Sequence, residues 1–307
     1  DQKSDGADVV ISGGTLTGGA YVASTNNLYS GYSNLTITGG TLTGGYATIY
    51  WPSFGKVIIG GTQEGEPNIS TDNGSAVMIC SGTLEVLGGT LNGSASEGYT
   101  TAELVQQYRQ YSGAANQGDA ITVIANRGKG YDGAPLSVTI SGGTFNGENN
   151  YAVRYIDCNT ANTPLEQDVQ VSISGGVFSG DLGPIDASFV PEENQKFISG
   201  GEFADNVSEY TEDNIAAVTR SRSGADTYFY GDSTESIEVE EDDEITVTVL
   251  PAGEEINLIS DSDVEVTIVN KTGAPIRVNG VEIENGGNGE TIKVPASTTN
   301  PPSHNPG

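Results

Sequence analysis

The chain has 307 residues, of which 43 are glycine, 12 are lysine or arginine and 41 are aspartate or glutamate, so its formal net charge is −29. This composition disfavours helical bundles and ordinary α/β enzymes, because glycine and β-branched residues are poor helix formers. The negative charge repels nucleic acids and anionic lipids, and no apolar run approaches the roughly 20 residues of a membrane span. We therefore expect an all-β protein that binds no nucleic acid and inserts into no membrane.

A short motif, V-x-I-S-G-G-T-Φ-x-G, recurs along the first two thirds of the chain. Its copies are VVISGGTLTG (9–18), LTITGGTLTG (35–44), VIIGGTQEG (57–65), LEVLGGTLNG (84–93), VTISGGTFNG (138–147), VSISGGVFSG (171–180) and KFISGGEF (196–203). Fainter strand-like units follow at 20–24, 46–51, 76–80, 120–126 and 151–157. Two or three short strands in each repeat predict one coil of a parallel β-helix, with coils about 4.8 Å apart.

Each position of the motif has a physical interpretation. Alternate valine and isoleucine side chains point inward, and the glycine pair lets the chain bend at a corner. The apolar residue after the bend then occupies an equivalent internal position in Leu16, Leu42, Leu91, Phe145, Phe178 and Phe203. Gln63 departs from this column. The glycine pairs that begin at residues 88 and 142 are 54 residues apart, and this double step predicts a coil that has lost its glycine pair.

The longest interruption of the repeat covers residues 94–118. Thr100 and Glu103 have the spacing of a capping box, and Leu104, Val105, Tyr108 and Tyr111 follow at helical intervals until Gly113. We expect a helix of about three turns against the wall of the solenoid. It either covers an apolar patch, which is the simpler interpretation, or forms one lip of a groove.

After the repeats, which we assign to a β-helix over residues 1–206, the chain becomes acidic and rich in strands. The predicted strands are Ser236–Val239, Ile245–Leu250, Ile256–Ile259, Val264–Asn270, Ile276–Val278 and Thr291–Val294. Residues 211–214 could start a short helix. Residues 207–296 form either a small β-module or, as we favour, a β-rich cap that blocks the open strand edges of the solenoid. The tail, 297–307, has the composition of a linker.

Catalytic and metal-binding residues cannot be identified from the sequence. The only histidine, His304, lies in the tail, which excludes histidine-based triads and histidine metal sites. Two carboxylates would suffice for glycoside hydrolysis, but the acidic residues of the repeats have no spacing that identifies an acid and a base. We assign no catalytic residue, no metal ligand and no required cofactor, and we expect weak structural calcium sites among the carboxylates and asparagines.

The two cysteines, Cys80 and Cys158, fall on the second repeated strand. Aligning the coils places one coil between them, so they lie two coil spacings apart, about 9.6 Å. A disulfide needs Cα atoms within about 7 Å of each other. We therefore predict two unpaired, largely buried thiols.

Aromatic residues are the best indication of a binding site. Several lie within GGYATIYWPSFGK (44–56), and Tyr29 and Tyr32 lie one coil earlier. Tyrosine and tryptophan offer flat apolar faces with a polar edge, which suits sugar rings. Alternation separates Tyr50 from Trp51, and we choose Tyr29, Tyr32 and Tyr50 for an exposed stripe. Trp51 is kept as a fourth candidate ligand-binding residue, and the opposite interpretation is that some of these side chains are internal.

The V-x-I-S-G-G-T-F-x-G repeat, with the Y-A-V strand that follows it, resembles large surface proteins of Gram-positive gut and anaerobic bacteria. These look like right-handed β-helices of the pectate-lyase-like superfamily, and some relatives are described as carbohydrate-binding rather than catalytic. The resemblance covers about residues 9–203, and residues 266–294 are similar to the terminal β-modules of such proteins. The arginine- and histidine-bearing active-site motifs of pectate lyases and polygalacturonases are not recognisable here, so no catalytic residue is carried over.

Together, the residues and the resemblance imply an all-β protein: a right-handed parallel β-helix with a short helical insertion near 94–118 and a C-terminal β-rich cap. The expected function is that of a secreted, non-catalytic adhesin or stalk at the Gram-positive cell surface or cell wall. We expect it to be a monomer and to bind a polysaccharide, a host glycan or a glycoprotein. The alternatives are a calcium-assisted polysaccharide lyase or glycoside hydrolase and a purely structural spacer.

Overall fold

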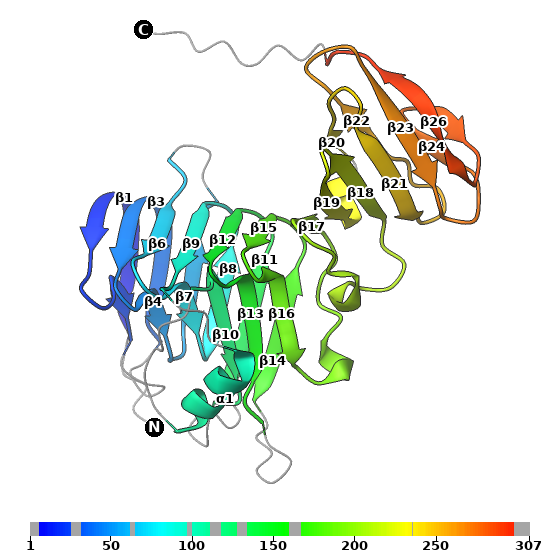
Figure 1. Ribbon diagram of the computed structural model, residues 1–307. Coiled ribbons are helices and arrows are strands. Elements are labelled where there is room, and N and C mark those ends of the chain that lie inside the picture. The colour runs from blue at the N-terminus through cyan, green and yellow to red at the C-terminus, as the bar shows by residue number, and fades with distance from the viewer. Residues whose placement is uncertain are drawn as a thin grey trace, which may run out of the picture. The chain divides into compact units, whose positions relative to one another are not determined.

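The computed structural model describes residues 6–25, 32–61, 65–96, 100–110, 118–127, 134–159, 167–234 and 236–297 (Figure 1). The described residues are mostly β-strands and contain one α-helix, so the expected all-β class is confirmed. By its internal contacts the chain divides into two compact units, Asp1–Asp213 and Asn214–Gly307. Each unit is described by itself.

The first unit contains the helix and the strands that the repeats form. Its elements are β1 (Asp8–Thr17), β2 (Ala23–Ser24), β3 (Asn34–Gly44), β4 (Ala47–Trp51), β5 (Lys56–Ile59), β6 (Asn68–Thr71), β7 (Ser75–Ile79), β8 (Gly82–Val86), β9 (Thr90–Ser94), α1 (Thr101–Gln110), β10 (Ile121–Ala125), β11 (Pro135–Ile140), β12 (Thr144–Glu148), β13 (Tyr151–Asp157), β14 (Asp168–Ile173), β15 (Val177–Gly180), β16 (Gly183–Phe189) and β17 (Gly201–Phe203). Short 3₁₀ helices cover Glu192–Asn194 and Ser208–Tyr210.

These strands form large parallel sheets in which successive copies of the motif pair with each other (Figure 1). Before the glycine pair the order is β3-β5-β8-β11-β14, and after it the order is β3-β6-β9-β12-β15-β17. The strands β1 and β3 run through their glycine pairs and belong to both rows. The fainter units form a second parallel sheet, in the order β2-β4-β7-β10-β13-β16. We call the strands that one motif copy begins, such as β11, β12 and β13, a tier.

An apolar column runs through the tiers at the position after the glycine pair. Its fully buried members are Leu42, Ile69, Leu91, Phe145, Phe178 and Phe203. The three phenylalanine rings stack, with centroids 4.7 and 4.8 Å apart. Gln63 lies outside the described residues. Ile69 holds the column position of that tier, because residues 62–67 separate Gly61 from β6.

The corner between the two rows explains why the motif requires two glycines. The first, Gly142, approaches the neighbouring tier so closely that an added Cβ would lie 2.7 Å from the carbonyl oxygen of Leu87. The second, Gly143, has a φ of 108°, a conformation that residues with a side chain rarely adopt. One position therefore needs space and the other needs a positive φ.

The expectation that a coil has lost its glycine pair between residues 88 and 142 is wrong. The strands β8 and β9 pair directly with β11 and β12, so Leu84 lies beside Val138 and Leu91 beside Phe145. The residues between β9 and β10, with α1, are an insertion within one tier, and β10 is the third strand of that tier. A long insertion and a degenerate coil both increase the number of residues between successive glycine pairs, and only the strand pairing distinguishes them.

The predictions for the cysteines and for the helix are confirmed, except that Tyr111 and Gly113, the expected end of the helix, lie outside the described residues. Neither Cys80 nor Cys158 forms a disulfide and both are buried, and β10 lies between β7 and β13, whose ends they follow. The helix α1 begins with the expected capping box, because the Thr100 amide and hydroxyl donate to Glu103 Oε2 over 3.0 and 2.7 Å. No helix in the described part of the chain is long and apolar enough to cross a bilayer.

The second unit mixes parallel and antiparallel pairs around its own apolar core. Its strands are β18 (Ala217–Arg222), β19 (Ala225–Tyr230), β20 (Ile237–Glu238), β21 (Glu244–Val249), β22 (Leu258–Ile259), β23 (Val264–Asn270), β24 (Ile276–Val278), β25 (Val281–Ile283) and β26 (Gly286–Val294), with a 3₁₀ helix at Gly231–Thr234. Three strands, β18, β19 and β25, were not predicted from the sequence. The short helix expected at residues 211–214 is absent from these described residues: Thr211 forms a bridge with Ile198, and Asn214 has a left-handed φ of 60°.

Candidate functional site

The aromatic residues chosen from the sequence do not form an exposed stripe. Tyr29 lies outside the described residues, and Tyr32 is 50% exposed and stacks on Phe54, with ring centroids 5.5 Å apart. Tyr50 is only 9% exposed and Trp51 only 3%. The expectation of an exposed Tyr50 is wrong because a helix covers the outward face of β4, while the other face lies in the interior.

The covering helix is α1, and its apolar face packs on the second sheet. Leu104, Val105 and Tyr108 join one buried cluster with side chains of four strands and the residues that follow them, which include Ala47, Tyr50, Met78, Cys80, Ile124, Ile156 and Cys158. The helix therefore covers an apolar patch, as the simpler of its two interpretations predicts.

Arg127 fixes Tyr50 beneath this helix. Its Nη1 donates to the Tyr50 hydroxyl over 2.8 Å and to the Cys80 Sγ over 3.3 Å, and its guanidinium lies 5.3 Å from the centroid of the Tyr108 ring. Burial raises the pKa of Tyr50 to about 12 and also raises the pKa of the Cys80 thiol. These groups are structural, because a buried neutral thiol and a bonded phenol offer a ligand no accessible face.

A buried ion pair joins the first turn of the helix to the same sheet. Arg154 and Asp119 are both fully buried, and the Arg154 Nε lies 3.0 Å from Asp119 Oδ2. Arg154 also donates to the Asn150 Oδ1 over 2.7 Å and to the Thr101 hydroxyl over 3.1 Å. The Thr101 hydroxyl donates onward to Asp186. The network satisfies the buried charges, as a stable interior requires.

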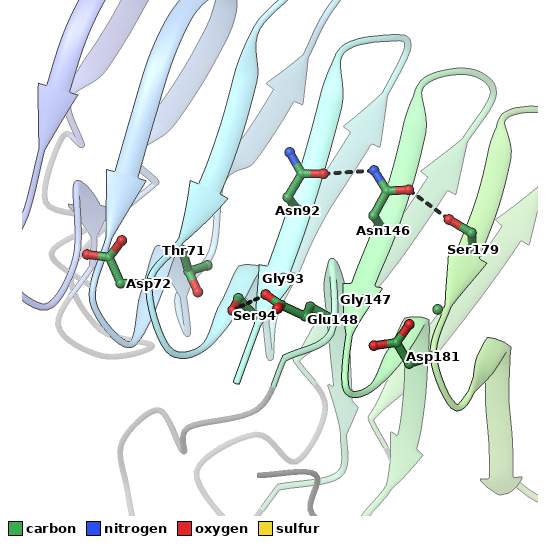
Figure 2. A pocket seen from close by; sticks show the side chains of 11 residues that line it. Thr71, Asp72, Asn92, Gly93, Ser94, Asn146, Gly147, Glu148, Ser179 and Asp181 are labelled. Atoms are coloured by element: carbon green, nitrogen blue, oxygen red, sulfur yellow. Dashed lines mark hydrogen bonds between the residues drawn. The ribbon is translucent and has the colours of Figure 1, made fainter. Parts of the chain in front are cut away.

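The outward face of the row β3-β6-β9-β12-β15 carries a different arrangement. One position of each tier bears a polar side chain, and register places these side chains side by side; they are Thr43, Ser70, Asn92, Asn146 and Ser179, which we call the polar ladder. Asn146 Nδ2 donates to Asn92 Oδ1 over 2.7 Å, and the Ser179 hydroxyl donates to Asn146 Oδ1 over 2.7 Å (Figure 2). The amides are thus held in one orientation by their neighbours.

A groove of about 580 Å³ follows this ladder across four strands. Its lining residues are Thr71, Asp72, Asn92, Gly93, Ser94, Asn146, Gly147, Glu148, Ser179, Gly180 and Asp181. Figure 2 shows two rows in it, the ladder side chains and, toward the strand ends, the carboxylates Asp72, Glu148 and Asp181. Glu148 accepts a hydrogen bond from the Ser94 hydroxyl over 2.6 Å, and Asp181 accepts one from the Asn149 amide over 2.7 Å.

The chemistry of the groove is that of hydrogen bonding. Its amides and hydroxyls both donate and accept, and its carboxylates accept. The lining residues include no lysine, arginine or histidine. In the described residues no group of three or more histidine, cysteine, aspartate or glutamate side chains is placed to hold a metal ion. Oxygen ligands other than carboxylates also bind calcium, so the calcium expectation stays a prediction.

The sequence contains a signal for this groove that the choice of aromatic residues as the binding site did not use. The residue before the last glycine of the motif is threonine in the first two copies, glutamate in the copy at 57–65, asparagine in the next two and serine in the copy at 171–180, so it is polar in each of them. An exposed aromatic residue, Tyr46, lies on the strand connection beside the groove and is 47% exposed. Its carbonyl accepts from the Ser75 amide, one tier on, just after the turn that carries Asp72. Comparison of the chain with protein-family models, with curated proteins and with solved structures gives no match.

Proposed function

We propose that the first unit is a right-handed parallel β-helix and that the protein is a non-catalytic, glycan-binding adhesin or stalk of the bacterial cell surface. The in-register parallel pairing of the tiers and the continuous apolar column support the solenoid. The resemblance of the repeat to Gram-positive surface proteins supports the location. A calcium-dependent contribution to binding belongs to the same proposal.

The observation that carries the proposal is the polar ladder at the floor of the groove. Asn92, Asn146 and Ser179 present hydrogen-bonding groups at the spacing of neighbouring strands, about 4.8 Å. Because the side chains already hold each other, a ligand rich in hydroxyl groups would order few of them on binding, which lowers the entropic cost. Tyr46, exposed near one end of the groove, offers a ring on which a sugar could stack.

The runner-up function is a polysaccharide lyase or glycoside hydrolase. The three carboxylates along one side of the groove, Asp72, Glu148 and Asp181, are the observation that favours it. A lyase also needs a base to take the proton from the sugar ring, and a basic side chain is missing from the residues that line the groove. The lining residues therefore argue against a lyase, and the hydrolase is the alternative that the assays below must distinguish from binding without turnover.

A glycan array, run with and without EDTA, tests the proposal together with assays for new reducing ends and for unsaturated products. We expect binding without product. Asn146→Ala should weaken the binding about tenfold, because it removes the centre of the ladder. Thr139→Ala is the matched control, since Thr139 is an exposed polar residue of β11 in the same unit that does not line the groove.

Each outcome distinguishes the alternatives. Product formation that Glu148→Gln abolishes would establish the enzyme, and loss of binding in EDTA would add calcium to the site. An array without signal would favour the structural spacer. Equal affinities of Asn146→Ala and the wild type would exclude the groove as the binding site, and the stacked pair of exposed Tyr32 and half-buried Phe54 would be the next candidate.

A further inference from the structure

A row of carboxylates runs along one side of the groove, beside the polar ladder (Figure 2). The pairing of β6, β9, β12 and β15 puts Asp72, Ser94, Glu148 and Asp181 at one position of four successive tiers. Glu148 and Asp181 are therefore one strand spacing apart, about 4.8 Å, and Asp72 and Glu148 are two spacings apart, about 9.6 Å. The three carboxylates are exposed, and we call them the carboxylate row.

The residues that line the groove include no basic side chain to offset the charge of this row. Glu148 accepts its hydrogen bond from the Ser94 hydroxyl and Asp181 from the Asn149 amide, which are both neutral donors. The ion pairs found in the described part of the chain use other carboxylates. Like charges on neighbouring strands repel each other, so a cation between Glu148 and Asp181 would be bound favourably.

The polar ladder points to the same kind of ligand through its hydrogen bonds rather than its charge. The Ser179 and Ser94 hydroxyls each have one hydrogen, and they donate it to Asn146 and Glu148. Asn146 directs one of its two amide hydrogens along the ladder to Asn92. An ionised carboxylate, in contrast, accepts about four hydrogen bonds. The groove therefore offers a ligand more acceptors than donors, and it suits a ligand that is rich in donors.

We propose that the ligand of the groove is a glycan that carries protonated amino groups, such as a β-1,4-linked chain of glucosamine. Its hydroxyl groups bond to the amides and hydroxyls of the ladder. Its ammonium groups, which donate three hydrogens and accept none, form charge-assisted hydrogen bonds with the carboxylate row. This assignment rests on the proposed glycan binding and adds to it the chemical class of the glycan.

Other classes of ligand match only part of the groove. A glycan of uronic acids or sulfated sugars is repelled by the carboxylate row and by the net charge of −29. A fully acetylated amino sugar is neutral and gains nothing from the row. A basic peptide such as oligolysine matches the row, but its side chains have no hydroxyl groups for the ladder.

Isothermal titration calorimetry of the full chain tests the assignment with three oligosaccharides of equal length. They are a β-1,4-linked oligomer of glucosamine, the same oligomer with its amino groups acetylated, and an oligomer of galacturonate. EDTA is present so that calcium cannot bridge an anionic sugar to the row, and a mildly acidic pH keeps the amines protonated. We expect the glucosamine oligomer to bind about tenfold more tightly than its acetylated form, and the galacturonate oligomer to bind most weakly. The preference should decrease as salt rises, since salt screens exposed charges.

Glu148→Gln tests the origin of this preference, because it removes the middle charge of the carboxylate row and keeps the size of the side chain. The ratio of the affinities for the glucosamine oligomer and its acetylated form should fall about threefold or more. Asp168→Asn is the matched control and should leave the ratio unchanged. Asp168 is an exposed carboxylate at the start of β14 in the same unit, and it does not line the groove.

The outcomes separate this assignment from glycan binding itself. Equal or tighter binding of the acetylated or the galacturonate oligomer would overturn the amino-sugar assignment and leave glycan binding by the groove intact. Oligolysine that binds as tightly as the glucosamine oligomer would also overturn it, and so would a ratio that Glu148→Gln and Asp168→Asn change equally. If none of the three oligosaccharides binds, a glycan-array signal that Asn146→Ala weakens would limit the failure to the amino-sugar assignment. Absence of every glycan signal would overturn the proposed function as well.

Discussion

Two outward faces of the first unit differ sharply, although both are made of parallel strands at the same spacing. The face of β4, β7, β10, β13 and β16 is covered by α1 and carries Tyr50, Met78, Thr122 and Arg154, which are all buried. The face of β6, β9, β12 and β15 stays open and carries the polar ladder. The polar groups of the covered face bond inward to one another and to the helix, whereas those of the open face bond sideways along the stack.

This difference shows which polar groups are structural and which are available to a ligand. A covered polar group must have a partner in the protein, because its desolvation is otherwise costly. A ladder amide at the surface keeps its remaining donors and acceptors for solvent or a ligand. The candidate site is therefore the polar ladder. The more extensive hydrogen-bond network around Arg154 is structural.

The largest effect should come from the buried ion pair of the covered face. Arg154→Met leaves Asp119 buried without its partner and should lower the free energy of unfolding by about 3–5 kcal/mol. Denaturant unfolding measures this loss. Lys56→Ala breaks a surface pair, Lys56–Glu85, whose Nζ and Oε1 atoms are 2.6 Å apart, and should cost at most about 1 kcal/mol. Recovery of stability in Arg154→Met with Asp119→Leu would locate the cost in the unpaired charge.

A smaller loss of stability should follow when the packing of α1 on the second sheet is weakened. Leu104→Ala removes a fully buried side chain of α1 from its contact with the sheet and should cost about 3 kcal/mol. Hydrogen exchange should then show earlier opening at β4 and β7 than at β12 and β15. Gln106→Ala, on the exposed side of the same helix, should change stability by less than about 0.5 kcal/mol. Uniform opening of all four strands would contradict a local role of the cover.

Alkaline pH should lower the stability of the fold, in part through Tyr50 of the covered face. Tyr50 has a pKa of about 12 in the folded chain, and the unfolded phenol ionises near pH 10. Between these values the folded state holds a proton that the unfolded state releases, so stability falls as pH rises. Between these two pKa values, Tyr50 should lower the free energy of unfolding by about 1.4 kcal/mol for each unit rise in pH. Unfolding curves of Tyr50→Phe should show a correspondingly flatter dependence, and Tyr46→Phe controls for the loss of one phenol.

The smallest effect on stability is expected on the open face. Asn146→Ala should change the free energy of unfolding by about 0.5 kcal/mol or less, because its partly exposed amide can be replaced by water. Thermal unfolding beside the wild type and Thr139→Ala measures this change. A loss of several kcal/mol would mean that the ladder holds the tiers together, and the contrast between the two faces would then disappear.

Much of the column could be predicted because it follows from a local rule. Leu42, Leu91, Phe145, Phe178 and Phe203 each stand at a fixed distance from a glycine pair, and strand alternation sends them inward. The rule did not predict Ile69, because residues 62–67 separate the preceding glycine pair from the strand β6. The helix was equally predictable, because its capping box and apolar spacing lie within a few residues of each other.

The prediction of an exposed aromatic stripe was wrong because exposure depends on residues far away in the sequence. Alternation states which side of β4 Tyr50 occupies, but it does not state whether a distant segment covers that side. The helix that covers it comes about 50 residues later, and Arg127 comes 77 residues later. The pairing of Arg154 with Asp119 likewise joins residues 35 apart.

The amino-acid sequence by itself determined the all-β class, the positions of the corners and the side of each strand that faces inward. These depend on neighbouring residues, through backbone sterics and the two-residue period of a strand. Which tier pairs with which, which outer face is covered and where polar side chains gather into a groove were decided only by the tertiary structure. Those properties arise from the burial of surfaces far apart in the chain, and burial depends on the whole fold rather than on local spacing.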